Sequence, residues 1–271
     1  MPDIAAILFL NAAVLLTIMV GLWGLSIRLG DVSFIDSFWA IGFVIVAWIS
    51  FLLADGVFER KLLLAALTTI WGLRLGGYLF YRWRKEGPDK RYVALLSKAG
   101  DRRHQVSLRK VFLLQGVLLW IVSLPLQLGQ APAAPAALGP LAYAGAALCL
   151  IGIAFETIGD WQLMKFKQNP ENAGKALDTG LWRYTRHPNY FGDACVWWGL
   201  YMIAAETVAG RFSIVGPLLL TFLLVKWSGA ALLERRLKRS RPEYADYIAR
   251  TSAFIPMPPK RVKQQTGHDA P

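Results

Sequence analysis

Apolar stretches of about 20 residues recur along the whole chain, and they constrain its fold more than any other feature. A helix of that length crosses the hydrocarbon core of a bilayer. The hydrophobic content of 55% and the mean hydropathy of +0.39 are also high for a soluble domain. The sequence therefore predicts an all-α, multi-pass integral membrane protein.

The apolar stretches predict seven transmembrane helices. We expect them at residues 4–27, 33–53, 62–81, 111–128, 141–166, 190–205 and 214–233. Residues 1–259 are expected to form one membrane domain, and residues 260–271 a disordered polar tail. Residues 241–250 combine tyrosines with alternating charge, which predicts a short amphipathic helix on the membrane surface.

The distribution of charge predicts the orientation of the chain. Residues 82–110, residues 165–186 and the tail after residue 234 are rich in Lys and Arg, whereas the alternate connections are poor in charge. Basic connections stay in the cytoplasm, so the N-terminus is expected outside and the C-terminus inside, in the inner membrane if the chain is bacterial. This pattern explains the net charge of +12, argues against a nucleic-acid partner and makes membrane lipids the expected neighbours.

The two cysteines, Cys149 and Cys195, both lie inside apolar stretches. We expect them to be small buried side chains, because no group of Cys and His has the spacing of a zinc site. The sequence predicts no metal site.

Polar residues at helical spacing mark one face of the fifth predicted helix. Glu156 and Asp160 are four residues apart, and Lys167 lies seven residues beyond Asp160. On an apolar helix such a stripe is expected to face a bundle interior or a wet cavity. Two interpretations stay open: a ligand site in which Lys167 anchors a phosphate, and an internal ion-pair ladder that holds helices together.

Residues 180–193, GLWRYTRHPNYFGD, combine many types of hydrogen-bonding side chain at the start of an apolar stretch. Pro188 favours a helix start, which places Asn189, Tyr190 and Asp193 in the first turns of the sixth helix. Polar groups beside lipid are costly unless they are satisfied or used. The pattern therefore indicates a site for a large, polar, anionic ligand.

Arg186 and His187 lie directly before this helix start. Cations beside a helix N-terminus form a good anion site. The alternative is helix capping together with lipid head-group contacts. That alternative explains the arginines, but it leaves the three polar residues of the first turns without a role.

A third polar group comes from the N-terminal half of the chain. Asp36 begins the second predicted helix, and Arg74, Tyr78 and Arg82 recur every four residues along the third. Because Arg74 lies inside an apolar stretch, we expect it to pair with an acid, either Asp36 or Asp160. Arg82 can instead extend toward the interface.

Glu234 ends the seventh predicted helix and is followed by Arg235 and Arg236. An acid among so many cations is expected to pair with one of them. The basic tail itself has two interpretations, a ligand role or a patch on anionic lipid.

The block RHPNYFGD at 186–193, followed by Trp197-Trp198-Gly199, resembles the signature of the DUF1295 / steroid 5-alpha-reductase-like membrane proteins. The related sterol C14-reductases share a similar block, and they also share an element similar to DWQLMKFKQNP at 160–170. The resemblance extends from about Asp31 to Pro259 and so covers nearly the whole chain.

This resemblance implies a seven-helix fold that binds NADPH in a cytoplasm-facing pocket, mainly within residues 150–259. The reaction it implies is reduction of a carbon–carbon double bond in a lipophilic substrate, an enone or a sterol- or isoprenoid-like molecule. The cofactor carries the hydride, and the protein supplies placement and a proton. The residues we assign to NADPH are Asp160, Lys167, Asn189, Tyr190 and Asp193, then Arg186, His187 and Glu234 as weaker members, with Arg74 and Arg82 added from the third helix.

The chain departs from the 5-alpha-reductases in its N-terminal half. Those enzymes carry a Gln-Glu pair in the second helix and a Tyr in the third to bind the substrate carbonyl. Here Ile35-Asp36 and Trp71 stand near those places, which argues against a 3-oxo-steroid substrate. We predict that Asp36 replaces the glutamate and that Tyr78, or else Tyr81, replaces the phenol, which makes Asp36 and Tyr78 the predicted catalytic pair.

Two other classes of protein remain as alternatives. Isoprenylcysteine carboxyl methyltransferases, which use S-adenosylmethionine, also carry an Arg-His-Pro-x-Tyr-x-Gly block and a C-terminal Glu followed by Tyr-x-x-Tyr. Glu234, Tyr244 and Tyr247 mimic that ending. S-adenosylmethionine has no phosphate, however, and would not need Lys167. The other alternative is a lipid-binding membrane protein without catalytic activity.

Overall fold

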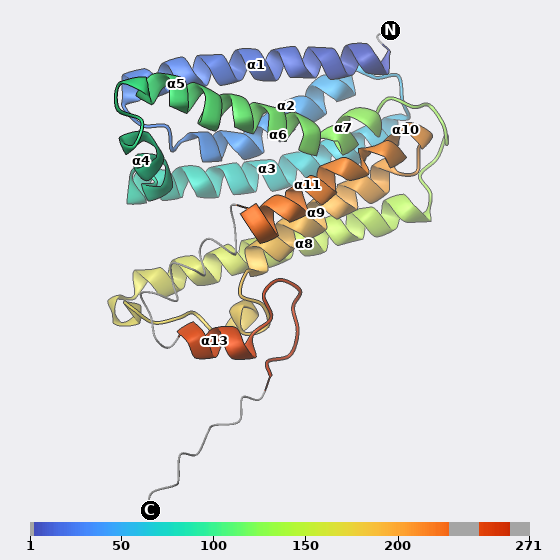
Figure 1. Ribbon diagram of the computed structural model, residues 1–271. Helices are drawn as coiled ribbons and strands as arrows, with labels where there is room; N and C mark the ends of the chain where they lie inside the picture. Colours follow the sequence, from blue (N-terminus) through green and yellow to red (C-terminus); the bar gives the residue numbers. More distant parts are fainter. Residues whose placement is uncertain (1–2, 228–243, 261–271) are drawn as a thin grey trace, which may run out of the picture. The chain divides into compact units, whose positions relative to one another are not determined.

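The computed structural model describes residues 3–227 and 244–260, and its long elements are all helices (Figure 1). Six segments are long and apolar enough to cross a membrane: Ile4–Leu29, Ile35–Leu53, Phe58–Glu86, Gly100–Val122, Pro140–Gln168 and Val208–Lys226. The predicted all-α, multi-pass membrane protein is thereby confirmed. The sixth predicted span forms helix α9 (Pro188–Ala204), whose 17 residues make it about 26 Å long, a little short of the hydrocarbon core. The count of seven spans therefore stays a prediction.

The chain forms two compact units. Unit 1 comprises residues 1–150 and 196–220, and unit 2 comprises residues 151–195 and 221–271. The elements that lie wholly in unit 1 are α1 (Ile4–Leu29), α2 (Ile35–Leu53), α3 (Phe58–Glu86), α4 (Lys90–Ser97), η1 (Gly100–Arg102), α5 (Arg103–Ser107), η2 (Leu108–Leu113), α6 (Leu114–Val122), α7 (Leu124–Leu128), α10 (Val208–Arg211) and η5 (Phe212–Ile214). Those of unit 2 are η3 (Pro170–Asn172), η4 (Gly180–Arg183), η6 (Leu223–Trp227) and α13 (Tyr244–Arg250), and three helices contribute residues to both units: α8 (Pro140–Gln168), α9 and α11 (Val215–Phe222).

Helix α1 shows why the exposed surface of unit 1 belongs in lipid. Its buried side chains form one narrow stripe that includes Ile7, Leu15 and Met19. The rest of the helix is also apolar, and Phe9 and Leu16 are 76% and 54% exposed. A helix that is apolar on all sides but buried on only one needs an apolar solvent on the others.

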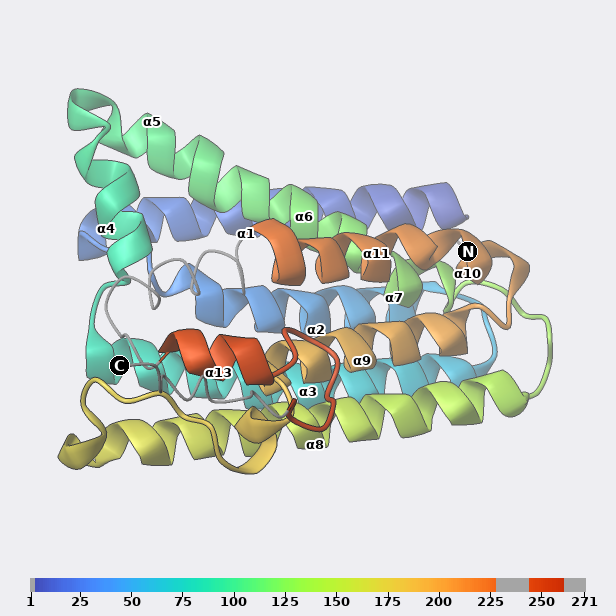
Figure 2. The ribbon, with the colours of Figure 1, turned by 60° about the horizontal axis from the view of Figure 1, so that its bottom comes forward.

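Helices α2 and α3 approach each other closely at two glycines. A Cβ atom on Gly72 would lie 2.9 Å from the carbonyl oxygen of Ala40, and one on Gly76 would lie 3.2 Å from that of Ser37. Small residues four apart let transmembrane helices meet backbone to backbone. This contact holds the first half of α2 and the second half of α3 side by side (Figures 1 and 2).

A polar cluster is buried where α1, α2 and α7 meet. The amide nitrogen of Asn11 donates to Ser50 Oγ at 3.0 Å and to Gln127 Oε1 at 3.2 Å, and all three residues are fully buried. At the other side of the bundle, buried Arg60 donates to the carbonyl oxygens of Pro132 and Pro135 at 3.2 and 2.6 Å. Hydrogen bonds within the protein make such polar groups tolerable in apolar surroundings, although Asn11 Oδ1 and Arg60 Nε have no hydrogen-bond partner among the described residues.

The region predicted as a basic loop, residues 82–110, is mostly helical, because α3 extends to Glu86 and α4, η1 and α5 follow. The predicted span 111–128 therefore starts earlier, at Gly100, and it is interrupted at Ser123. The interruption has a local cause: Pro125 has no N–H to donate to the preceding turn, and its ring disfavours helical geometry before it.

The two long helices α8 and α9 contact each other through glycines in both units. In unit 1, a Cβ on Gly145 would lie 2.6 Å from the carbonyl oxygen of Gly199. In unit 2, a Cβ on Gly192 would lie 2.6 Å from that of Gly152. Glycines 145, 152 and 159 recur every seven residues, so they line one face of α8. Both cysteines are buried, as predicted.

Candidate functional site

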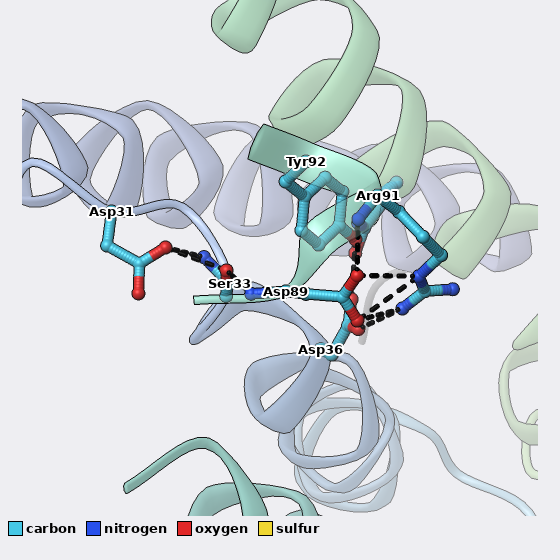
Figure 3. Close-up of polar contacts among 7 residues, drawn as sticks. Asp31, Ser33, Asp36, Asp89, Arg91 and Tyr92 are labelled. Carbon is cyan, nitrogen blue, oxygen red and sulfur yellow. Dashed lines mark hydrogen bonds and ion pairs between the residues drawn. The ribbon is translucent and has the colours of Figure 1, made fainter. Parts of the chain in front are cut away.

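The start of α2 carries a polar cluster that joins four segments of unit 1 (Figure 3). Asp31 positions the residues before this helix. Its Oδ1 accepts from the Ser33 backbone N–H at 2.9 Å and from the Ser33 hydroxyl at 2.7 Å. Its Oδ2 accepts from Trp83 Nε1 at 2.7 Å. The Ser33 hydroxyl in turn accepts from the backbone N–H of Asp89 at 2.8 Å. The link between α3 and α4 is thereby held against the first turn of α2.

Asp36 lies at the centre of this cluster. Its Oδ2 accepts from Arg91 Nη2 at 2.8 Å, and its Oδ1 accepts from the phenol of Tyr92 at 2.5 Å. Figure 3 shows Arg91 and Tyr92 reaching Asp36 from α4. The Asp36 side chain is only 22% exposed, so the carboxylate has both oxygens engaged by donors in a largely dry position.

Arg91 is shared between two carboxylates. Besides Asp36 it contacts Asp89, with Arg91 Nε at 3.1 and 3.2 Å and Nη2 at 3.0 Å from the Asp89 oxygens. Burial opposes ionisation of Asp89, but the hydrogen bonds from Arg91 and the charges of Arg91 and Arg82 outweigh it, so the pKa of Asp89 lies below its ordinary value. The same contacts with Asp89 and Asp36 raise the pKa of Arg91 despite its burial. Asp89 and Arg91 are therefore both held in their charged forms.

The phenol of Tyr92 is the neutral acid of the cluster. It accepts a hydrogen bond from Gln115 Nε2 at 2.9 Å while it donates to Asp36. Burial, followed by the negative charge of Asp36 and the hydrogen bond to it, raises the pKa of Tyr92 well above its ordinary value. The arrangement holds a protonated phenol between an amide donor and a carboxylate, and it directs the phenolic proton at Asp36.

Asp36 was found from the sequence, but its partners were not. Arg91, Tyr92 and Gln115 lie 55 to 79 positions further along the chain, and the first two were placed in a loop. Of the remaining predicted residues, Arg74, Tyr78 and Arg82 are half-buried on α3. The two acids considered for Arg74 have other partners in the structure: Asp36 pairs with Arg91, and Asp160 accepts a hydrogen bond from Asn189.

A second polar group lies in unit 2, where α8 faces the start of α9. Glu156 and Asp160 are 3% and 5% exposed, so these two members of the predicted stripe face the interior, whereas its third member, Lys167, is exposed. Asn189 Nδ2 donates to Asp160 Oδ1 at 3.2 Å. The helices can come this close because a Cβ on Gly159 would already lie 3.3 Å from the Asn189 backbone nitrogen. Lys167 is exposed near the end of α8.

The segment before α9 is fastened to α8 by side chains of both. Gln162 Oε1 accepts from the backbone N–H of Leu181 at 3.0 Å, and Trp182 Nε1 donates to the carbonyl oxygen of Gly159 at 3.1 Å. Gly180 has φ +59°, and a Cβ there would lie 2.2 Å from Gln162 Nε2, so the close approach requires glycine.

Arg186, predicted to bind an anion, is used by the fold itself. Its Nη1 donates to the carbonyl oxygens of Ile248 at 3.1 Å and Thr251 at 2.5 Å. Its backbone N–H donates to the carbonyl oxygen of Ser252 at 2.9 Å, beside a parallel β-bridge between Thr185 and Ser252. The C-terminal segment 244–260 is thus attached to the Arg-His-Pro-Asn block.

Helix α13 completes this attachment. Tyr244 and Tyr247 are buried, and Tyr247 donates to the carbonyl oxygen of Trp182 at 2.6 Å. Arg250 forms an ion pair with Asp178. The short helix predicted at residues 241–250 is present over its described part, but its tyrosine face packs on the protein and not on lipid.

The remaining predicted residues lie close to this segment or outside the described chain. His187 is 1% exposed and stacks on Tyr190, with the ring centroids 5.2 Å apart and the planes within 7°. Asp193 lies one turn after Asn189 on α9. Glu234 falls in 228–243, outside the described residues, as does the predicted tail from 261 onward.

The apolar helices with polar groups at their ends define a multi-pass helical membrane protein. The sequence model of the family described as "Protein of unknown function (DUF1295)" matches residues 22–251, so the chain belongs to the DUF1295 family. The uncharacterized protein C594.04c of Schizosaccharomyces pombe is 22% identical over an alignment of 276 positions. The alignment covers 87% of this chain and 75% of that protein. No solved structure matches the chain.

Proposed function

We propose that this protein is a membrane reductase that uses NADPH to reduce a carbon–carbon double bond in a lipophilic substrate. The observation that supports this most is the hydrogen bond from Asn189 to buried Asp160 in unit 2. An amide and a carboxylate side by side match the hydroxyls and carboxamide of a nicotinamide dinucleotide. Lys167, exposed two turns further along α8, offers a cation for a phosphate. NADPH would supply the hydride.

The cluster in unit 1 contains a phenol, a type of donor that such a reaction needs. Reduction of an enone requires a donor at the carbonyl oxygen, where negative charge develops. Because Asp36 accepts hydrogen bonds from both Arg91 and Tyr92, Asp36 acts as the group that orients the donors. We therefore assign the donor to Tyr92 in place of Tyr78: its hydroxyl would turn from Asp36 to the substrate oxygen, while Gln115 holds the phenol oxygen.

The proposal includes seven spans, with the N-terminus outside and the C-terminus in the cytoplasm, as in the inner membrane of a bacterium. It is supported by the six long apolar helices and by the apolar character of α9. The basic segments then lie on the side where NADPH is available. A reporter that is active only in the cytoplasm should therefore be active when it is fused after residue 271. Activity on the opposite side would require an even number of spans, given an external N-terminus.

Ligand titration of the detergent-purified protein tests the cofactor. We expect NADPH to raise the midpoint of thermal unfolding more than NADH does. The reason is that Lys167 is assigned to the 2′-phosphate, which NADH lacks. Asn189→Ala should weaken the binding of NADPH at least about 10-fold, which corresponds to about 1.4 kcal/mol of binding free energy. Lys167→Gln should do the same, whereas Lys165→Gln, an exposed lysine of the same helix end, should leave affinity unchanged.

The other outcomes of this titration identify the alternatives. Stabilisation by S-adenosylmethionine alone would make the protein a methyltransferase of the isoprenylcysteine carboxyl methyltransferase type. Stabilisation by neither ligand would favour a lipid-binding protein without catalytic activity.

Turnover separates the two tyrosines. With a long-chain enone as the probe substrate, we expect Tyr92→Phe to bind NADPH normally and to oxidise it about 100-fold more slowly than the unaltered protein. Tyr78→Phe should retain most of the activity. The reverse result would reinstate Tyr78 as the donor and remove Tyr92.

A further inference from the structure

A basic surface lies in unit 1 beside the end of α1, and the reductase proposal makes no use of it. It consists of six exposed cations, Arg28, Lys98, Arg102, Arg103, Arg109 and Lys110, which we call the basic elbow. Figures 1 and 2 show α4 and α5, which carry or border most of these residues, at the same end of unit 1 as the end of α1.

The basic elbow is held in place by specific contacts. Trp23 of α1 donates from Nε1 to the carbonyl oxygen of His104 at 3.1 Å and to Ser107 Oγ at 3.2 Å. Arg103 Nη2 donates to the carbonyl oxygen of Gly30 at 3.0 Å, and Gly30 ends α1 in the left-handed conformation. These contacts fix α5 on the last turn of α1, where Arg28 lies.

The charges of the basic elbow are not balanced by neighbouring acids. Over residues 3–227 and 244–260, none of its six cations forms an ion pair, and Asp101 is the carboxylate within the stretch 98–110. Arg91 on α4 differs, because Asp36 and Asp89 neutralise it. Six unneutralised cations on one surface create a positive potential that attracts anions.

The surface continues directly into an apolar, exposed helix face. Lys110 is followed at helical spacing by Leu114 and Val117, which are 45% and 56% exposed. A lipid molecule has the matching order of chemistry, with a charged head group joined to apolar chains. Free phosphate matches the cations but not Leu114 and Val117.

We propose that the basic elbow binds anionic phospholipids, with the head-group phosphates on its cations and the acyl chains along Leu114 and Val117. Each Lys or Arg near an anionic surface strengthens binding about fivefold. None of the six cations is among the residues assigned to NADPH or to proton donation, so this proposal does not depend on the reductase proposal.

The test compares phosphatidylglycerol with phosphatidylcholine of the same chain length, added to the detergent-purified protein. Native mass spectrometry counts the lipids retained, and thermal unfolding reports the stabilisation. The altered protein carries Arg102→Gln, Arg109→Gln and Lys110→Gln; Arg103 is kept because it caps α1. The matched control carries Arg102→Lys and Arg109→Lys and so keeps every charge.

The expected result is preferential retention of phosphatidylglycerol, weakened about 100-fold by the three glutamine substitutions and preserved in the lysine control. Equal retention of the two lipids by the unaltered protein overturns the proposal, and so does unchanged phosphatidylglycerol binding by the glutamine variant. If inorganic phosphate at the same concentration stabilises the protein as strongly as phosphatidylglycerol, the surface is a free-anion site and not a lipid site. If the glutamine variant does not fold, the proposal is still tested by comparing how the unaltered protein binds phosphatidylglycerol, phosphatidylcholine and inorganic phosphate.

Discussion

The phenol of Tyr92 donates a 2.5 Å hydrogen bond to Asp36, although the two residues are 56 positions apart in the chain. Arg91, the preceding residue, holds the other carboxylate oxygen. Two consecutive residues of an eight-residue helix therefore fix that helix to the start of α2. Since α4 is too short to be stable alone, its position depends on these contacts.

The first prediction concerns stability at alkaline pH. Burial and the Asp36 carboxylate raise the pKa of Tyr92 above its ordinary value of 10.0. As the pH rises past 10, the unfolded chain loses the phenolic proton while the folded chain keeps it, so the contribution to stability is complete below pH 10 and declines above it. The thermal midpoint of the unaltered protein should therefore fall more steeply between pH 10 and 11 than that of Tyr92→Phe. Parallel slopes would show that the phenol titrates normally.

The second prediction concerns acid. Asp89 has a pKa below its ordinary value of 3.8 because Arg91 and Arg82 outweigh the effect of its burial. Its contribution is complete above pH 3.8 and is lost as the pH falls below that value, where the unfolded chain takes up the proton first. Asp89→Asn should lower the thermal midpoint at pH 6 and shrink its dependence on pH between 4 and 2. Glu59→Gln, an exposed acid of α3, serves as the control and should change neither.

The third prediction concerns the glycines between α8 and α9. In Gly192→Ala the added methyl group would lie 2.6 Å from the carbonyl oxygen of Gly152 and 2.7 Å from the nitrogen of Glu156. Both are backbone atoms of a helix and cannot move aside singly, so we expect a loss of about 1–3 kcal/mol in the free energy of unfolding. Gly21→Ala on α1 has no atom within 4 Å of the new methyl group and should be neutral. Equal stability of the two variants would contradict the close packing.

The fourth prediction separates two neighbouring arginines. Arg186 donates to the carbonyl oxygens of Ile248 and Thr251, whereas Arg183 is exposed. Arg186→Gln should release the segment 244–260 and accelerate hydrogen exchange of its amides, because two carbonyl groups lose their charged donor. Arg183→Gln should leave exchange in that segment unchanged. If Arg186→Gln exchanges at the original rate and loses NADPH affinity instead, the arginine serves the ligand and not the fold.

The sequence predicted the features that depend on nearest neighbours along a helix. Apolar runs located the long helices, and the spacing of Glu156 and Asp160 placed both on the buried face of α8. The membership of the DUF1295 family was also correctly identified from the RHPNYFGD block. These inferences succeed because helical periodicity and short motifs are local properties.

Contacts between distant segments could not be read in the same way. Asp36 was considered as a partner of Arg74, but in the structure it contacts Arg91 and Tyr92, because the position of an acid in the sequence does not specify which of many cations will reach it. The partners of Arg186 could not be predicted for a similar reason. They are backbone carbonyl oxygens, which every residue has, so the sequence does not single them out. The interruption at Ser123, by contrast, had a visible cause in Pro125.

The distance in sequence between Asp36 and its partners also bears on how the chain is made. Asp36 precedes Arg91 by 55 residues, so α2 is synthesised before either donor to its carboxylate exists. An unneutralised carboxylate is costly in hydrocarbon. We therefore expect the first turn of α2 to stay at the aqueous boundary until α3 and α4 have been synthesised. Insertion of α2 and α3 would then be complete only after α4 contacts the start of α2.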